Sequence, residues 1–420
     1  MEPASHYIDR SKFGKTVETC AIKFLANNAS KYLKDYKEFL LNMEKSPNIP
    51  KEYNEEGYKL LLLNPQYKKD EFASWPEKLK SLVETNKYEL VDYQVKLNYE
   101  DLNIQEVLQQ ILPKDVVIPG GFETVGNIAH LNLRSSQLPY KNIIGQVILD
   151  KNSKIKTIVN KTEKLSNVFR TPELEVIAGE NNLETELKEG GCIYRLNFEK
   201  VYWNSKLQAE RDRLLAQLKP NEVLCDMFCG IGPLSIRAAK KGLRVLANDL
   251  NPMCYEYLQI NAKLNKVEKL VECYNMDARE FMKDMVLNRE NKVHIDHIYM
   301  NLPVDAVEFL DAFNGLFQTA PQDVWNQDNL PTIHVNGFDG GKDLDEVKKN
   351  FRERMGKAFG RELDENFSFS IHQIKDISSE KKMYCLTFKL PYEIAYGALR
   401  QRDATNDEEF DKIEKKVKLD

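Results

Sequence analysis

From residue 196 to residue 393 the sequence alternates between short apolar runs and amphipathic segments, and no other feature limits the fold as strongly. Runs such as "EVLCDMF" and "RVLAND" predict buried strands, and helical segments such as "PLSIRAAKKG" and "PMCYEYLQINAKLN" follow them. Strands and helices that alternate in this way predict βαβ units, which form a parallel sheet with right-handed crossovers. Near the end, "FSFSIHQIKDI" and "KMYCLTFKL" flank a polar turn and predict an antiparallel hairpin. We therefore expect an α/β fold, a Rossmann-like sheet with a terminal antiparallel hairpin.

Two regions of different character precede this sheet. Residues 1–84 carry apolar side chains at helical spacing, as in "KYLKDYKEFLLNMEK", and predict a mostly helical N-terminal accessory region. Residues 85–195 contain the β-rich runs "YELVDYQVKL", "IGQVILD" and "KIKTIVN", with "KNSK" as a hairpin turn, and predict a small α+β domain. The sheet domain then covers residues 196–393, and we expect a flexible tail over residues 394–420.

Composition excludes some classes of protein and leaves others open. No apolar run approaches the roughly eighteen residues of a membrane span, so we expect no membrane contact. The seven cysteines form no CxxC pair and no zinc-ligand spacing, which favours reduced thiols in an intracellular protein without a metal site. A net charge of -5 argues against nucleic acid, but eight basic and only two acidic residues lie between Arg134 and Arg170. This local excess suits phosphates, and charge alone slightly favours the alternative, a solvated lysine-rich face.

The segment "DMFCGIGP", which begins at Asp226 and contains Gly230, predicts a ligand-binding loop after the first strand. It is neither a Walker loop nor GxGxxG, because no GK[ST] follows and Pro233 breaks the glycine spacing. The next strand ends in Asp249 and Leu250, where an acid can accept hydrogen bonds from both ribose hydroxyls of a nucleoside.

The third strand ends in "NMDARE", which places Asp277 and the backbone of Ala278 near an adenine amino group. Together with the glycine loop and the acid that ends the second strand, this pattern predicts binding of S-adenosylmethionine. The alternative is a generic nucleotide-binding sheet without methyl transfer.

The fourth strand ends abruptly in "IYMNLPVDAV", with Asn301 directly after the apolar run and Pro303 two residues later. Both residue types favour turns, so the segment fits an ordinary strand-to-helix connection. A position at the carboxyl end of a strand in an open α/β sheet also faces the ligand crevice. We therefore expect the amide of Asn301 to reach both cofactor and substrate, and Pro303 to aim the following carbonyls at the substrate.

Several segments together resemble the eukaryotic and archaeal tRNA (guanine-37 N1)-methyltransferases: "NIAHLNLR", "IGQVILDKN", "NVFRTPELEVIAGE", "KVYWNSKLQAERDRL", "DMFCGIGP", "ANDLNP" and "NLPVDAVEFLDAF". The resemblance covers about residues 115–393. It implies a class I methyltransferase fold, S-adenosylmethionine as cofactor, and an RNA-binding domain ahead of the sheet. It also implies tRNA with guanosine at position 37 as the partner, which is methylated at N1 in the first step towards wybutosine in tRNA-Phe.

The resemblance assigns roles to particular residues. Guanine N1 carries a proton at neutral pH, so a base must remove it and a positive group must stabilise the charge on O6. By resemblance the base is Glu210 and the positive group is Arg170, while Tyr202 stacks on the flipped base and Arg211 contacts the cofactor. Other readings stay open: Glu210 pairs with neighbouring arginines, Arg170 contacts a phosphate, and Tyr202 is a core aromatic.

Three rival functions remain at this point. An aminocarboxypropyl transferase of the wybutosine route uses the same cofactor, but the pairing of "NVFRTPE" with "AERDRL" favours deprotonation of a guanine. An inactive tRNA-binding protein would not need the set of acids at the strand ends. A DNA or protein amide methyltransferase usually continues Asn-Pro-Pro-aromatic, which this chain does not. By resemblance we expect a monomer in the nucleus, cytoplasm and mitochondrial matrix.

Overall fold

The computed structural model describes residues 8–43, 45–53, 55–162, 169, 171–288, 293–302 and 306–397. The chain forms two compact units that interleave in sequence. The first comprises the N-terminal part as far as residue 122, together with residues 131–160 and 176–180. The second comprises residues 123–130, 161–175 and the chain from residue 181 onwards. This division differs from the one expected from sequence, because the region 85–195 contributes to both units.

The N-terminal part of the first unit is an antiparallel sheet in the order β2-β1-β3. Its elements are β1 (Gly14–Leu25), α1 (Ala29–Asp35), β2 (Tyr58–Leu62), α2 (Glu77–Asn86) and β3 (Glu89–Asn98). The mostly helical prediction is therefore wrong for this region: in its described residues, "KYLKDYKEFLLNMEK" contributes to α1 and forms the short 3-10 helix Lys37–Phe39. The missed sheet pairs β1 with β2 and β3, partners distant in sequence, around a core that includes Phe24, Leu61 and Trp75.

The remainder of the first unit contains α3 (Ile104–Ile111), α4 (Lys141–Lys151), and the adjacent strands β6 (Thr157–Lys161) and β7 (Leu174–Gly179). The predicted strand "IGQVILD" is thus a helix, and "KNSK" does not close a hairpin. The reason is packing: Ile144, Val147 and Ile148 are buried on one side of α4. A Cβ atom on Gly145 would lie 3.0 Å from the Ile177 side chain, so glycine allows a close approach of the helix to β7 that a larger residue would permit only after a small shift.

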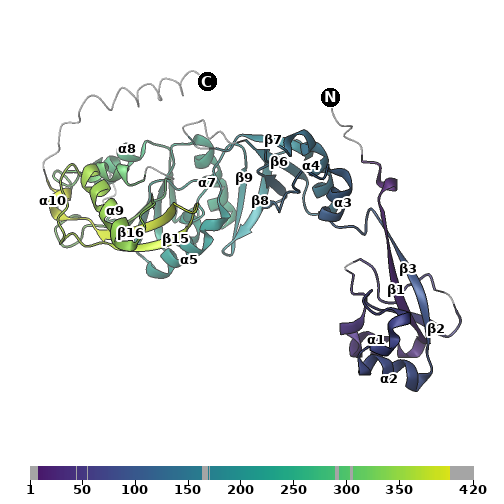
Figure 1. Ribbon diagram of the computed structural model, residues 1–420. Helices are drawn as coiled ribbons and strands as arrows, with labels where there is room; N and C mark the ends of the chain where they lie inside the picture. The colour runs from purple at the N-terminus through teal and green to yellow at the C-terminus, as the bar shows by residue number, and fades with distance from the viewer. Residues whose placement is uncertain are drawn as a thin grey trace. The chain divides into compact units, whose positions relative to one another are not determined.

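The second unit is built on a seven-stranded sheet in the order β12-β11-β10-β13-β14-β16-β15. Its strands are β10 (Val223–Asp226), β11 (Arg244–Asn248), β12 (Val271–Tyr274), β13 (His297–Met300), β14 (Thr332–Asp339), β15 (Ser370–Asp376) and β16 (Lys382–Lys389). The strands from β12 to β14 are parallel, and β16 pairs antiparallel with both β14 and β15. The predicted sheet with its terminal hairpin is confirmed, and the hairpin lies at the edge of the sheet (Figure 1).

Helices and two further hairpins complete the second unit. The helices are α5 (Gln208–Gln217), α6 (Ser235–Lys240), α7 (Pro252–Leu264), α8 (Ala278–Lys283), α9 (Leu344–Ala358) and α10 (Tyr392–Ala395). The hairpins are β4 (Glu123–Val125) with β5 (Ile128–Leu131), and β8 (Glu184–Glu189) with β9 (Cys192–Asn197). Asn251, Asp277 and Asp343 cap the N-termini of α7, α8 and α9 with their side-chain oxygens, which fixes where each helix begins. No helix in the described part of the chain is both long and apolar enough to cross a membrane.

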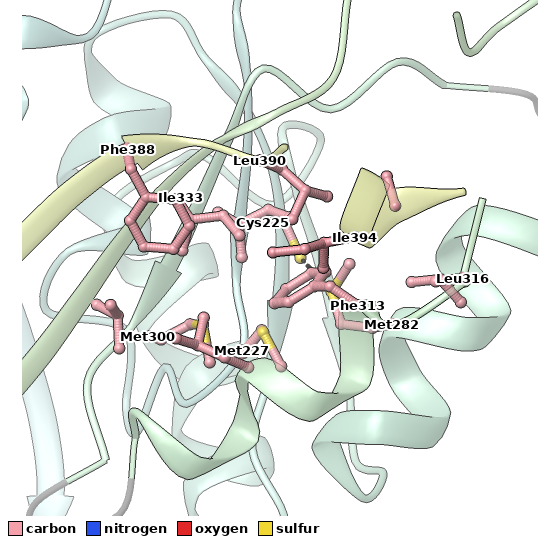
Figure 2. Close-up of a cluster of buried hydrophobic side chains, with 14 of the residues drawn as sticks. Cys225, Met227, Met282, Met300, Phe313, Leu316, Ile333, Phe388, Leu390 and Ile394 are labelled. Atoms are coloured by element: carbon pink, nitrogen blue, oxygen red, sulfur yellow. Dashed lines mark hydrogen bonds between the residues drawn. The ribbon is translucent and has the colours of Figure 1, made fainter. Parts of the chain in front are cut away.

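A large apolar core fills one side of this sheet (Figure 2). Met227 directly follows β10, and Met300 is the last residue of β13. Ile333 and Phe388 come from β14 and β16. Phe313 reaches the same cluster from the 3-10 segment Glu308–Phe313. Burial of each such side chain contributes about 1.5–3 kcal/mol, so the core holds the strand ends in fixed positions. The order of the sheet reverses between β10 and β13, and ligands of open α/β sheets bind at the carboxyl ends of the strands beside such a reversal.

Candidate active site

The loop after β10 contains two glycines, Gly230 and Gly232, whose surroundings differ. Gly230 has φ +55°, and a Cβ atom built on it meets no heavy atom within 4 Å, so its outer side is open to a ligand. Gly232 has φ +89°, and a Cβ atom there would lie 2.6 Å from Leu258 on α7. Gly230 therefore allows a close approach to the backbone, whereas Gly232 allows the loop to pack against α7.

Asp249 lies directly after β11 and is tied to this loop. Its Oδ2 accepts a hydrogen bond from the Gly230 N–H at 2.8 Å, and its Oδ1 accepts one from the Asn251 N–H at 2.9 Å. Desolvation raises the pKa of Asp249, and the two backbone N–H groups oppose that rise. A carboxylate has about four lone-pair positions, and the two N–H groups and the Cys254 thiol leave room for a ligand hydroxyl, so Asp249 can still accept from a diol.

The end of β12 completes the same edge of the sheet. Asn275 Nδ2 donates to the backbone carbonyls of Asp249 and Leu250, at 2.8 and 2.9 Å. The side chain of Leu250 is 48% exposed, an apolar surface beside an otherwise polar strand end. Asp277 is exposed and caps α8, where its Oδ1 accepts from the Arg279 N–H at 2.9 Å. The structure therefore brings Asp249, Leu250 and Asp277 to adjoining strand ends, while Ala278 is buried in the first turn of α8.

Asp226 has a different environment from the one expected of a ligand contact. It is 1% exposed, and its Oδ2 accepts a hydrogen bond from Ser235 Oγ at 2.7 Å. Burial raises the pKa of Asp226 to about 7, and the charge of Asp249 adds to the rise. The structure therefore gives Asp226 a supporting position between the end of β10 and the start of α6, and a direct cofactor contact stays a prediction.

Glu210 lies in α5, is 3% exposed, and pairs with Arg213 one turn further along. Arg213 Nε donates to Oε2 at 2.7 Å, and Nη2 donates to Oε1 at 2.6 Å. His372 on β15 places its Nε2 3.7 Å from Oε2. Burial, with the charge of Glu210 as the next cause, raises the pKa of Cys385 to about 12, so this neighbouring thiol stays protonated. The arginine pairing allowed by the sequence is thus present, but Glu210 is buried rather than on a solvated face.

Arg211 lies in the same helix, Tyr202 precedes it, and the two side chains have opposite environments. The Arg211 guanidinium is buried, donates to both oxygens of Glu189 at 2.7 and 3.0 Å, and donates to the Asn204 carbonyl at 3.2 Å. Its donors are thereby committed to protein partners, and a contact with the cofactor stays a prediction. Tyr202 is 39% exposed, which rules out a core role and leaves its ring accessible to a stacking base, whereas Trp203 is buried.

Asn301 follows β13, and its amide is held by the neighbouring strand. Asn336 on β14 donates from Nδ2 to Asn301 Oδ1 at 2.9 Å, and also to the hydroxyl of Tyr299 at 3.0 Å. Burial raises the pKa of Tyr299 well above its ordinary value, and the charge of Glu210 contributes to that rise. His372, 3.7 Å from Glu210, lies opposite Cys385, and Cys385 lies opposite Asn336, the partner of Asn301, so Asn301 and Glu210 belong to one polar region at the sheet. The predicted site residues Arg170 and Pro303 lie outside the described residues.

Sequence reasoning missed the residues that β14, β15 and β16 bring to this region. Asn336, His372 and Cys385 belong to no local motif, and they meet only because β16 pairs with both of its neighbours. The one available signal was the buried polar residue in "TIHVNGF", since an asparagine inside an otherwise apolar strand requires hydrogen-bond partners.

The strand ends fit a nucleoside with a sulfonium side chain. The open backbone at Gly230, the carboxylate of Asp249 and the exposed Leu250 supply a close approach, a diol acceptor and an apolar face for a purine. S-adenosylmethionine, when bound there, supplies an activated methyl group. The sheet topology, the glycine loop and these residues together define a class I methyltransferase.

Comparison with known proteins identifies the particular family. Residues 185–320 match the family described as "TRM5/TYW2 methyltransferase domain", and residues 104–182 match "TYW2 N-terminal domain". Three relatives are named tRNA (guanine(37)-N(1))-methyltransferase. The protein from Phytophthora infestans is 40% identical and covers 97% of each chain. The protein from Paramecium tetraurelia is 43% identical, and the match covers 82% of this chain and 85% of the relative. The protein from Danio rerio is 36% identical, and the match covers 97% of this chain and 86% of the relative.

Solved structures agree with this assignment. Trm5b from Pyrococcus abyssi has a TM-score of 0.58 at 27% identity, and the match covers 89% of this chain and all of that one. The complex of aTrm5 with tRNALeu has a TM-score of 0.63 at 24% identity, over 88% of this chain and 99% of that one, which is a likeness in fold. The chain belongs to the tRNA (guanine(37)-N(1))-methyltransferase family and, like that family, uses S-adenosylmethionine.

Proposed function

We propose that this protein transfers the methyl group of S-adenosylmethionine to N1 of guanosine 37 in tRNA, with Glu210 as the general base. The observation that carries the proposal is the buried, bidentately held carboxylate of Glu210 in the same polar region as Asn301. A carboxylate shielded from water and fixed in orientation is suited to removing a proton from a weakly acidic ring nitrogen.

The remaining groups would place the base and stabilise the charge that develops on it. A carboxylate has about four lone-pair positions, so Glu210 can accept the N1 proton on a position that Arg213 leaves free. Arg213, whose pKa Glu210 raises, keeps its positive charge beside the base. Loss of the N1 proton moves negative charge to O6, where Arg170 is the partner that the family resemblance implies. The exposed ring of Tyr202 would stack on the guanine once it leaves the anticodon stem-loop stack.

Methylation of defined transcripts tests the proposal. The purified protein should methylate a tRNA transcript with guanosine at position 37 and should leave an adenosine-37 transcript unlabelled, with the position mapped by mass spectrometry. Glu210→Gln should lower kcat by roughly a hundredfold or more, because the amide cannot take the proton, while cofactor binding is retained. Equal labelling of both transcripts would refute the substrate, and an unchanged rate for the variant would remove Glu210 as the base.

A matched control separates loss of the base from loss of an ion pair. Glu272 on β12 pairs with Arg244 Nη2 at 2.6 Å in the same unit. Glu272→Gln removes a comparable glutamate–arginine pair at a partly exposed position, and we expect its kcat to match that of the unmodified protein. A similar loss in both variants would indicate general destabilisation.

The aminocarboxypropyl transferase alternative has less support. TYW2 from Pyrococcus horikoshii has a TM-score of 0.50 at 25% identity, and the match covers 68% of this chain, whereas methyltransferase relatives cover up to 97%. The mass of the modified nucleoside distinguishes the two reactions directly. A methyl adduct supports the proposal, and an aminocarboxypropyl adduct would replace it.

We also infer, from the family resemblance, a monomeric enzyme that serves the nucleus, cytoplasm and mitochondrial matrix. Sedimentation of the purified protein tests the first statement. Fractionation of cells that express a tagged chain tests the second, and a single labelled compartment would contradict it.

A further inference from the structure

The most informative unexplained polar group is Asn336, in the middle of β14. It is 2% exposed and lies opposite Cys385 in the register of β14 with β16. A buried amide of this kind destabilises a sheet unless its polar atoms find partners. Its Nδ2 has two, Tyr299 and Asn301, while its Oδ1 has no hydrogen-bond partner in the described part of the chain.

The direction of this network follows from the hydrogen bonds of Asn336. An amide NH2 group only donates, so the hydroxyl oxygen of Tyr299 accepts from Asn336 Nδ2 at 3.0 Å. The second hydrogen of the same Nδ2 is then available for Asn301 Oδ1 at 2.9 Å.

This network fixes which end of the Asn301 amide is left for a ligand. Because Asn301 Oδ1 accepts from Asn336, the part of the amide that has no hydrogen-bond partner among the described residues is its NH2 group, which only donates. Guanine carries an acceptor, O6, at the position where adenine carries an amino group, which donates. An outward NH2 group is thus complementary to guanine, and an outward carbonyl oxygen would be complementary to adenine.

We propose that Asn336 is a specificity-determining positioning residue: it holds the Asn301 amide with its NH2 group towards the target base, so that the site accepts a purine with O6 and rejects one with a 6-amino group. The inference rests on the proposed function, since it assumes that the target base lies against Asn301. The preference for O6 over a 6-amino group would thus depend on a residue inside the sheet that does not itself contact the base. An energetic preference of this kind arises because the rejected base would leave two donors facing each other without an acceptor.

The test reverses the network with one atom. Asn336→Asp has the same shape, and its ionised carboxylate accepts from the Asn301 NH2 group and turns the Asn301 oxygen towards the base. Because burial favours the protonated acid, which would still donate to Asn301 Oδ1, the variant is assayed above about pH 8 as well as at pH 7. Transcripts that carry guanosine, inosine or 2,6-diaminopurine at position 37 then report the outcome. Inosine keeps O6 without the 2-amino group, and diaminopurine replaces O6 by an amino group. For the unmodified protein, kcat/KM should be high on guanosine and inosine and low on diaminopurine.

In Asn336→Asp the ratio of guanosine to diaminopurine kcat/KM should fall by roughly ten- to a hundredfold, and inosine should fall together with guanosine. Asn336→Ala, which frees the Asn301 amide to rotate without adding charge, should lower the ratio by a smaller factor and serves if the Asp variant does not fold. An unchanged ratio in a folded variant would overturn the proposal. If the unmodified protein does not methylate guanosine 37 at all, the proposed function itself fails, which is a separate result.

Asn314 offers a matched control. It lies in the same unit, is partly buried, and donates from Nδ2 to the Ala358 carbonyl at 3.2 Å. Asn314→Asp removes a comparable amide hydrogen bond, and the ratio of guanosine to diaminopurine should stay as in the unmodified protein. A double variant, Asn301→Ala with Asn336→Asp, should show the ratio of Asn301→Ala alone, because Asn336 is proposed to act only through Asn301.

Discussion

At the scale of single residues, the site depends on carboxylates whose surroundings differ although their side chains are the same. Asp249 is held by two backbone N–H groups, Glu210 by an arginine, and Asp226 by one serine hydroxyl. Backbone and guanidinium donors stabilise a charged carboxylate, whereas at Asp226 complete burial outweighs the hydrogen bonds of Ser235 and the Phe228 backbone and disfavours the charge. Asp226 therefore titrates in a range where the protein is easily studied, and its effect on stability can be measured.

Replacement of Asp226 by Asn should change how stability depends on pH. The folded protein keeps the Asp226 proton up to about pH 7, and the unfolded chain releases it near the ordinary value of 3.8. Unfolding therefore releases a proton between these values, so this group makes the free energy of unfolding fall as the pH rises from about 4 to about 7. Asp226→Asn removes this pH dependence. Relative to the unmodified protein, the free energy of unfolding of the variant should therefore rise by up to about 4 kcal/mol between pH 4 and pH 7. Denaturant unfolding at pH 4, 5.5 and 7 measures the difference, and parallel profiles would contradict it.

Substitutions of the two loop glycines should have different effects: one mainly on cofactor affinity, the other mainly on the stability of the fold. Gly230→Ala adds a methyl group where the structure is open, so it should weaken cofactor binding by roughly tenfold and cost about 1 kcal/mol of stability for its left-handed backbone. Gly232→Ala places a Cβ atom 2.6 Å from Leu258 and should destabilise the fold by roughly 2 kcal/mol or more. Calorimetric titration with cofactor and thermal unfolding distinguish the two effects. The reverse pattern would show that the open side of the loop is not the cofactor side.

At the scale of elements, α7 serves as an edge partner for β9. Asn261 accepts from the Arg195 N–H at 2.8 Å and donates to the Arg195 carbonyl at 3.2 Å, while Asn265, one turn later, bonds both backbone groups of Ile193. Two asparagines four residues apart thus replace the ladder of a neighbouring strand. This is why the hairpin β8–β9 belongs to the second unit, and why a boundary at residue 195, placed by sequence composition, divides the unit.

Asn261→Leu should expose this dependence. The variant leaves the N–H and carbonyl of Arg195 without their partners, together with the Ile231 carbonyl that Asn261 also bonds at 3.1 Å. We expect a loss of roughly 2–4 kcal/mol, visible as a lower Tm. Lys263→Leu adds the same side chain to an exposed position of the same helix and should leave the Tm nearly unchanged. Equal losses in both variants would show that the asparagine bonds add little to stability.

The difference between interactions of neighbouring residues and contacts of elements that are distant in sequence explains what could be predicted from sequence. Strand-helix alternation predicted the sheet, which is confirmed, because it depends on neighbours within a few residues. The roles of Gly230 and Asp249, inferred from local motifs, and of Glu210, implied by the family resemblance, stay predictions. The helix α4 was mistaken for a strand because its β-branched residues carry a strand propensity that packing on β7 overrides. Asn336 could not be assigned a role in advance, since its partners depend on which strands lie side by side in a sheet whose order is not sequential.

At the scale of the whole molecule, the two units have separate apolar cores. The N-terminal sheet encloses its own cluster, between Cys20 and Val83, and the large core of the second unit begins at Cys225. Every residue that the structure brings to the candidate cofactor site belongs to the second unit. Changes in separately packed units that share no partners combine additively, so we expect the N-terminal sheet not to influence cofactor affinity.

Deletion of residues 1–98 tests this separation. The deletion removes the strands β1, β2 and β3 with their core and keeps Gly230, Asp249 and Leu250 with the sheet that positions them. Cofactor affinity of the shortened chain should therefore stay within about threefold of the full chain, measured by calorimetric titration. Gly230→Ala in the full chain is the positive control, since it should weaken the same titration. A tenfold loss on deletion would mean that the first unit contributes to the cofactor site, whereas retained affinity with reduced methylation of tRNA would place its contribution in binding the RNA.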